Sequence, residues 1–256
     1  MRKFILHIVT LCCLILVTSC GISEDCFKGN GNQITQTFTL ENFSKIKVYD
    51  GVGLVVKEGP NYEVKIKTSD NIIDNLEVKL EGNMLVIKDN STCNIARDYG
   101  QTTVYITIPD GTILPLVQEL ELHCKTEQKI VSDGILHSPI VRLFSLGDDG
   151  DGAGTGDFYI NVDNGQFVVE SNNVSNFYIS GHCSEMLLNF YFGDGRFYGE
   201  NLRAENIKLY HRGSNDMFVY PIQKIEGTIF ATGNVVLKNV PPIIDVEEVF
   251  RGRLIY

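Results

Sequence analysis

The chain has 256 residues, of which 43% are hydrophobic, and a formal net charge of −10. A negative surface repels phosphate backbones, so we expect no nucleic-acid partner. The sequence contains no P-loop, no GxSxG nucleophile elbow and no HExxH motif, and it therefore predicts no cofactor and none of these catalytic sites.

The first twenty residues, MRKFILHIVTLCCLILVTSC, have the features of an export signal. Two basic residues precede an apolar run from Phe4 to Val17, which is shorter than the ~20 residues of a membrane-spanning helix. The ending Val17-Thr18-Ser19-Cys20 resembles the lipobox of bacterial lipoproteins, in which cleavage precedes the cysteine and the thiol carries a diacylglycerol. The resemblance predicts a signal peptide over residues 1–19 and lipidation at Cys20, so the membrane becomes a partner through the anchor.

Residues 20–32 are interpreted as a lipidated tether and residues 33–256 as a single domain. Loss of residues 1–19 removes two of the 22 basic residues and none of the 32 acidic ones, which leaves a net charge of −12. Gly21 after the cysteine indicates the outer membrane, by resemblance to lipoprotein sorting. Glu24-Asp25 resembles the acidic signal that directs Bacteroidetes lipoproteins to the cell surface, and the periplasmic face is the alternative location.

The stretch from Gln33 to Pro109 alternates apolar and charged residues, as in YEVKIKT at 62–68 and LEVKLEG at 76–82, which is typical of strands with one face in water. Gly82-Asn83 lies between two such runs and predicts a two-residue hairpin turn. No long amphipathic helix follows the signal, so the class is all-β, with hairpin elements expected in this half.

Several landmarks in this half resemble the DUF2807 family of auto-transporter adhesins with a head GIN domain. They are Asp25-Cys26-Phe27-Lys28-Gly29, the strand Phe43 to Val48, the segment VVKEGPNYEVKIKTSDNI, the segment GNMLVIKDN and Cys93. The resemblance covers the mature chain and implies a right-handed parallel β-helix in a Bacteroidetes lipoprotein. It brings no catalytic residue.

The last hundred residues repeat about every twenty positions. Phe158, Phe177, Phe197 and Phe218 lie 19, 20 and 21 residues apart, each preceded by turn-forming residues and followed ten residues later by a second apolar run. Each copy therefore reads as strand, turn, strand, turn. No copy can bury its own apolar face, so the copies must stack, and the repeat predicts a parallel β-helix, a β-solenoid.

The Phe-Tyr pairs that open three of the copies predict a surface strip. Strand alternation sends the two members of a pair to opposite faces, and Ile160 and Ile179 place the phenylalanines inside. The tyrosines Tyr159, Tyr178 and Tyr198 would then form an exposed column about 4.8 Å apart. Such a column can hold a glycan or protein ligand, and it can equally be a row of good strand formers.

Four cysteines remain after the signal and the anchor. The family resemblance favours a disulfide between Cys26 and Cys93, which would also fasten the end of the tether to the first strands. Cys124 and Cys183 would be either buried free thiols or a second disulfide. No cysteine or histidine spacing predicts a zinc site.

The segment GDDGDGAGTGD at 147–157 is rich in glycine and aspartate. Asp148, Asp149 and Asp151 could supply oxygen ligands for calcium, although the calcium-binding nonapeptide that the segment resembles works by repetition and only one irregular copy is present. A glycine-rich corner is the alternative.

Three functions fit these features. The first is a non-catalytic envelope lipoprotein that binds glycan or protein as an adhesin, which we take as our prediction. The second is a carbohydrate-active enzyme, for which Asp194, Arg196 and Asp216 are the nearest approach to a cluster of acidic and basic groups. The third is a structural or assembly component of the outer envelope.

Overall fold

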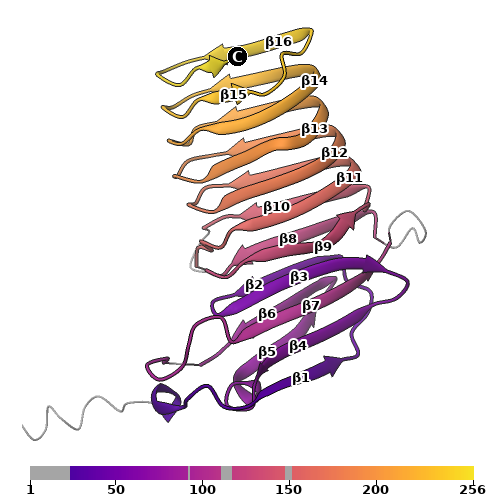
Figure 1. Ribbon diagram of the computed structural model, residues 1–256, viewed down its shortest axis with the longest axis vertical. Coiled ribbons are helices and arrows are strands. Elements are labelled where there is room, and N and C mark those ends of the chain that lie inside the picture. Colours follow the sequence, from indigo (N-terminus) through magenta and orange to yellow (C-terminus); the bar gives the residue numbers. More distant parts are fainter. Residues whose placement is uncertain (1–23, 92, 111–116, 148–151) are drawn as a thin grey trace, which may run out of the picture.

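The computed structural model describes residues 24–91, 93–110, 117–147 and 152–256. These residues form one mixed sheet of 17 strands and two short 3-10 turns, Glu24–Phe27 and Ile73–Asn75, with no α-helix. None of the helices in this part of the chain has the length and apolarity to cross a membrane. The strands lie side by side along the long axis of the molecule, from the N-terminal part at one end to the C-terminus at the other (Figure 1).

The N-terminal part contains seven strands in mixed orientation. Strand β4 lies between β1 and β7 and is antiparallel to both, and β5 and β6 form an antiparallel hairpin, whereas β2–β6 and β3–β7 are parallel. The predicted hairpin is confirmed, because Glu81 pairs with Met84 across Gly82-Asn83, and Gly82 has a φ of 62° that suits glycine. The strands are β1 (Gln33–Phe38), β2 (Lys45–Tyr49), β3 (Val52–Gly59), β4 (Glu63–Ser69), β5 (Leu76–Glu81), β6 (Met84–Asp89) and β7 (Thr102–Pro109).

In the C-terminal part every pairing among the described strands is parallel. The four longest strands, β11 to β14, are the repeat copies, and each pairs with the next. The strands are β8 (Glu119–Lys125), β9 (Ile130–Leu136), β10 (Ile140–Ser145), β11 (Phe158–Ser171), β12 (Asn176–Phe190), β13 (Arg196–His211), β14 (Met217–Ile229), β15 (Val235–Leu237), β16 (Ile243–Glu248) and β17 (Leu254–Ile255).

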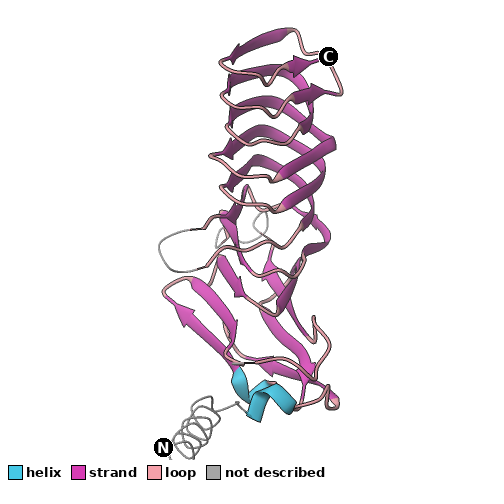
Figure 2. Cartoon of the chain, turned by 90° about the vertical axis from the view of Figure 1, so that its left-hand side faces the viewer, coloured by secondary structure: helices cyan, strands magenta, loops and turns pink. Residues whose placement is uncertain are grey.

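The prediction of a right-handed parallel β-helix, or β-solenoid, is wrong for this chain. The sheet is mixed, and each repeat copy is one strand of 13 to 16 residues rather than two short strands separated by a turn. The reason is that strand pairing runs through the middle of the copies: Asp163 lies opposite His182 and Asn164 opposite Cys183, and the β12–β13 and β13–β14 pairings resume after local register shifts. Gly181 in β12 and Gly227 in β14 have positive φ, which lets a strand bend without ending. The result is a curled sheet, whose rungs Figure 2 presents from the side.

One apolar core runs through both parts, from Phe43 to Leu237. Phe158, Phe177 and Phe197 are fully buried, as alternation predicted, and the rings of Phe158 and Phe177 stack with centroids 4.8 Å apart. The fourth copy differs from the prediction by one residue, since Met217 rather than Phe218 lies opposite Phe197. Phe218 therefore belongs to the outer column that also contains the tyrosines.

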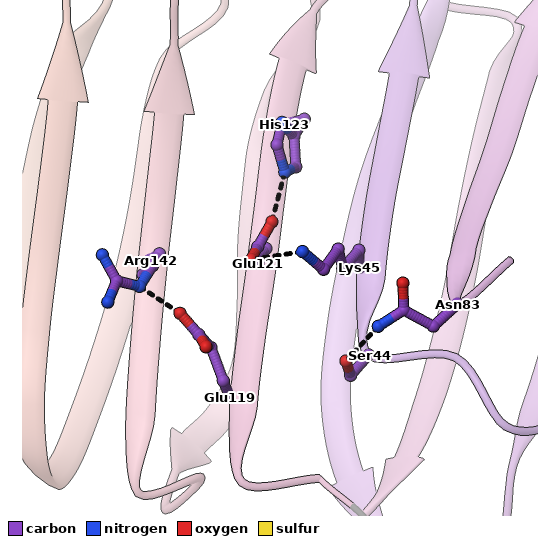
Figure 3. A network of polar contacts seen from close by, with 7 residues as sticks. All are labelled: Ser44, Lys45, Asn83, Glu119, Glu121, His123 and Arg142. Carbon is purple, nitrogen blue, oxygen red and sulfur yellow. Dashed lines mark hydrogen bonds and ion pairs between the residues drawn. The ribbon is translucent and has the colours of Figure 1, made fainter. Parts of the chain in front are cut away.

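The two parts join where β2 pairs with β8 and β3 pairs with β9. A polar network covers the first of these seams (Figure 3): the buried carboxylate of Glu121 accepts from Lys45 Nζ and His123 Nε2, each at 2.8 Å. Burial raises the pKa of Glu121, but the bonds to Lys45 and His123 outweigh it, so the net shift is downward and the carboxylate stays charged. Arg142 and Glu119 form a neighbouring ion pair one strand further on.

A candidate ligand-binding strip

The predicted tyrosine column exists as a continuous aromatic ladder. The ring centroids of Tyr159 and Tyr178 are 4.7 Å apart, those of Tyr178 and Tyr198 are also 4.7 Å apart, and the interplanar angles are 7° and 3°. Phe218 extends the ladder at 5.7 Å from Tyr198. We call these four residues the aromatic strip.

Parallel register creates the strip, because it places equivalent residues of β11, β12 and β13 opposite one another. Their buried neighbours Phe158, Phe177 and Phe197 fix which face the tyrosines occupy. Tyr178 is 36% exposed, so the strip lies at the surface but is only partly in water.

An open groove of about 380 Å³ runs beside the three tyrosines. Its polar wall consists of equivalent residues of successive strands: Asn161 lies opposite Ser180, and Ser180 lies opposite Asn201. Ser132 and Glu200 also line it. A groove of this size with one aromatic wall and one wall of amide and hydroxyl groups has the dimensions and chemistry of a small-ligand or oligomer site.

The faces of the strip's rings are already occupied. Each inner ring is covered by its neighbours, and the ends of the strip are covered by ammonium groups: Lys129 Nζ lies 5.2 Å from the Tyr159 centroid and Lys238 Nζ lies 5.0 Å from that of Phe218. What the strip offers to a ligand is therefore ring edges and phenol oxygens. Aromatic edges carry partial positive charge, so this surface favours ligands rich in acceptor oxygens.

The phenol of Tyr178 acts as a neutral hydrogen-bonding group. Partial burial, followed by the nearby Asp157 carboxylate and the two adjacent tyrosines, raises the pKa of Tyr178. Arg196 Nη1 donates to Tyr198 Oη at 3.5 Å and adds positive charge beside the strip. Protonated phenols can both donate to and accept from a hydroxylated ligand.

Asp194, Arg196 and Asp216 each form hydrogen bonds to a neighbouring turn. Asp194 bonds Ser214 and Arg196 Nη2 donates to Asn215 Oδ1 at 3.2 Å. Asp216 Oδ1 accepts from the backbone and side-chain nitrogens of Asn234, both at 2.9 Å. Each of these groups ties one turn to the next, as Asp157 does with Asn176.

The other predicted site residues have separate places in the molecule. Cys26 and Cys93 form a disulfide, with their Cα atoms 4.6 Å apart. Cys124 and Cys183 are buried free thiols, and burial raises the pKa of Cys124 to about 11 and that of Cys183 to about 12. The lipidation residue Cys20 and the calcium candidates Asp148, Asp149 and Asp151 lie outside the described residues.

Sequence spacing gave no indication of one cluster that folding assembles. Ligand atoms of Glu58, Asp110 and His137 lie within 4.8 Å of one another, close enough to share one ion. Glu58, however, already accepts hydrogen bonds from the backbone nitrogens of His137 and Ser138 at 2.9 and 2.8 Å, and its second oxygen lies 3.0 Å from His137 Nδ1. The Glu58 carboxylate thus holds the backbone at His137 and Ser138 in place. The contact joins residues 79 positions apart in the sequence, so no local sequence pattern could predict it.

The family model described as "Putative auto-transporter adhesin, head GIN domain" matches residues 42–241. Among solved structures, a putative adhesin from Bacteroides fragilis NCTC 9343 has a TM-score of 0.71 at 18% identity, covering 87% of this chain and 96% of that one. A putative lipid binding protein from Parabacteroides distasonis ATCC 8503 has a TM-score of 0.57 at 13% identity, covering 89% and 98%. No curated protein matches the chain. Structural similarity at such low sequence identities establishes a shared fold only. The match to the family model spans most of the sequence, and the chain therefore belongs to the DUF2807 family.

Proposed function

We propose that this protein is a lipid-anchored outer-membrane adhesin that binds a glycan along the aromatic strip without cleaving it. The observation that carries the proposal is the strip and its groove: a row of phenols and a row of amide and hydroxyl groups run together across three successive strands. The family's adhesin description agrees with a binding role. The anchor rests on the lipobox-like ending at Cys20.

The chemistry of the strip favours an extended, acceptor-rich glycan over a flat platform ligand. Sugar rings that stack on proteins need an open aromatic face, and the faces here are taken by neighbouring rings and lysines. Hydroxyl, carboxylate or sulfate oxygens of a polymer lying along the strip would instead meet phenols, ring edges and the cations Lys129, Arg196 and Lys238. The carboxylates of Glu200 and Asp157 lie beside the same rings, so the charge at the strip is mixed and the hydroxyl oxygens of a glycan are the groups that we expect it to bind.

The test incubates the purified protein with neutral and acidic polysaccharides and measures retention. Changing Tyr159, Tyr178 and Tyr198 together to Ser should weaken retention by about tenfold or more, since aromatic anchors dominate such surfaces. The matched control is the same triple change in a second aromatic ladder, Tyr191, Tyr210 and Phe230. Its ring centroids are 5.9 Å apart between Tyr191 and Tyr210 and 4.7 Å apart between Tyr210 and Phe230. Equal loss of binding in the two triple variants would refute the assignment to the strip.

The same incubation separates binding from catalysis. New reducing or unsaturated ends that disappear in an Asp194→Asn variant would favour the carbohydrate-active enzyme instead. Absence of both retention and cleavage, with host-matrix binding of whole cells unchanged by deletion of the gene, would favour the structural role.

The anchor has its own experiment. Mass spectrometry of the mature N-terminus should find a diacylated Cys20, and a Cys20→Ser variant should leave the membrane fraction. Unchanged partitioning of that variant into detergent would contradict lipidation.

A further inference from the structure

Three parallel strands end side by side at the seam between the two parts. Strand β3 pairs with β7 and with β9, and all three run in the same direction. Their carboxyl ends therefore meet at one edge of the sheet. Glu58 is the last residue but one of β3, Asp110 directly follows β7, and His137 directly follows β9. Parallel pairing thus brings together two carboxylates and an imidazole that are far apart in the sequence.

The two carboxylates continue apolar columns of the core. By strand alternation, Glu58 shares the face of the fully buried Val56, and only 7% of its side chain is exposed. Asp110 lies two positions after the fully buried Ile108 in the same way. Oxygen atoms of the two carboxylates lie within 4.8 Å of each other. Two carboxylates this close repel each other at neutral pH unless a positive charge lies between them.

The hydrogen bonds of Glu58 hold one of its oxygens in place and direct the other toward His137. Oε1 accepts from the backbone nitrogens of His137 and Ser138 at 2.9 and 2.8 Å and from Ser138 Oγ at 2.9 Å. Oε2 lies 3.0 Å from His137 Nδ1. Carboxylates that bind metal ions are held by hydrogen bonds in this manner, which orient the oxygen that ligates.

The spacing of these atoms suits one metal ion. Two neighbouring ligands bound at about 2.1 Å on perpendicular axes lie about 3.0 Å apart, which is the separation of Glu58 Oε2 and His137 Nδ1. The Asp110 oxygen lies within 4.8 Å of both. A carboxylate has about four lone-pair sites, so Asp110 can bind an ion and keep other hydrogen bonds.

The types of ligand indicate the class of ion. Imidazole suits Zn²⁺ and the other late first-row metals, whereas Ca²⁺ is bound by oxygen atoms alone. One imidazole and two carboxylates therefore favour a zinc-type ion over calcium.

We propose that Glu58, Asp110 and His137 form a site for a zinc-type divalent ion that fastens the two parts of the sheet together. Glu58 and Asp110 belong to the N-terminal part, and His137 follows the strand of the C-terminal part that pairs with β3. The ion supplies positive charge between the two carboxylates, and water completes its coordination. The proposal does not depend on glycan binding by the aromatic strip.

Isothermal titration calorimetry tests the site on the purified full-length protein, in detergent and without a polyhistidine tag, with zinc chloride as the probe. We expect one ion per chain. We also expect the melting temperature to rise by about 5 °C when free zinc is about 100 times the dissociation constant.

Two variants remove one ligand each and keep the surrounding bonds. Glu58→Gln retains an acceptor oxygen for the backbone nitrogens and replaces the ligating oxygen by an amide group. His137→Gln retains the backbone nitrogen that donates to Glu58. Each variant should weaken zinc binding by about tenfold or more, with little change in the melting temperature of the zinc-free protein.

His182 supplies the matched control, because it also lies between two carboxylates. Its Nδ1 lies 3.3 Å from Asp163 Oδ1 and its Nε2 lies 3.6 Å from Glu205 Oε1. Each carboxylate faces a different ring nitrogen, so the three groups do not converge on one ion. His182→Gln should therefore leave zinc binding unchanged.

Three outcomes would overturn the proposal. They are the absence of saturable zinc binding, zinc binding that His137→Gln leaves unchanged or that His182→Gln weakens equally, and calcium binding as tight as zinc binding.

Hydrogen exchange tests whether the ion joins the two parts. Zinc should slow the exchange of amides at the ends of both β3 and β9, and His137→Gln should abolish this slowing. Slowing that is confined to β3 and β7 would show that the ion does not bridge the seam.

Discussion

The N-terminal and C-terminal parts use the same kind of strand and build different surfaces from it. The N-terminal part combines antiparallel and parallel pairs, so residues opposite one another are unrelated in the sequence: Val64 lies between Phe38 and Ile106. In the C-terminal part, parallel register puts Phe158 beside Phe177 and Tyr159 beside Tyr178. A repeat becomes a ladder only where register is parallel, which is why the strip and its groove lie in the C-terminal part.

The largest expected effect lies in the inner ladder. Phe177→Ala should lower the free energy of unfolding by roughly 3 to 5 kcal/mol, because loss of the buried ring leaves a cavity. The centroid of this ring lies 4.8 Å from that of Phe158 and 5.6 Å from that of Phe190. Urea unfolding measures this loss of stability, with Tyr178→Ala in the outer ladder as the matched control. A loss below about 1 kcal/mol would mean that the ladder does not carry core packing.

Removing the disulfide should lower the stability of the N-terminal part. Cys26 and Cys93 are 67 positions apart in the sequence, and a bond that closes a loop of this length stabilises the protein by roughly 4 kcal/mol in the chain-entropy model. In the double Cys→Ser variant we expect amides of β5 and β6 to exchange hydrogen faster, while those of β12 and β13 keep their protection. Equal loss of protection in both parts would indicate that they unfold as one unit.

Acid should weaken the C-terminal part through His211. This imidazole is fully buried, and burial, the largest cause, lowers its pKa from 6.5 to about 4. The folded state then binds the proton less readily than the unfolded chain, so stability is lost as the pH falls from about 6.5 to about 4, by about 3 kcal/mol in total.

His211→Phe should remove this component of the pH dependence, since Phe190 occupies the equivalent place one strand earlier. Urea titrations of both proteins at pH 7.5 and pH 4 give the difference that belongs to the histidine. Parallel stability curves for the two proteins would contradict the assignment.

The smallest expected effect is at the seam between the parts. Glu121→Gln should cost about 1 kcal/mol, because it replaces the ion pair with Lys45 by a hydrogen bond from the ammonium to a neutral amide oxygen while keeping the shape of the side chain. Separate unfolding of the two parts, seen as two transitions in the variant and one in the parent, would identify the seam as the link that couples them.

Short-range sequence patterns predicted the local features of the fold. Alternation identified the strands of residues 33–109 and the turn at Gly82-Asn83, and the Phe-Tyr pairs identified which side chains face inward at Phe158, Phe177 and Phe197. These features depend on residues a few positions apart, so a local sequence pattern is enough to predict them. The landmarks from Cys26 to Cys93 were also enough to suggest the family that the family model identifies.

The order in which the strands pair could not be predicted from such patterns. Strand β2 lies between β6 and β8, which are separated from it by tens of residues, and no local pattern specifies such partners. The middle of each repeat looked like a turn because glycine and polar residues occur there, yet hydrogen bonds to the adjacent copies keep it in the strand and curl the sheet. The same parallel pairing moved Phe218 into the tyrosine column and covered the faces of its rings, because ring contacts are set by register between strands rather than by sequence.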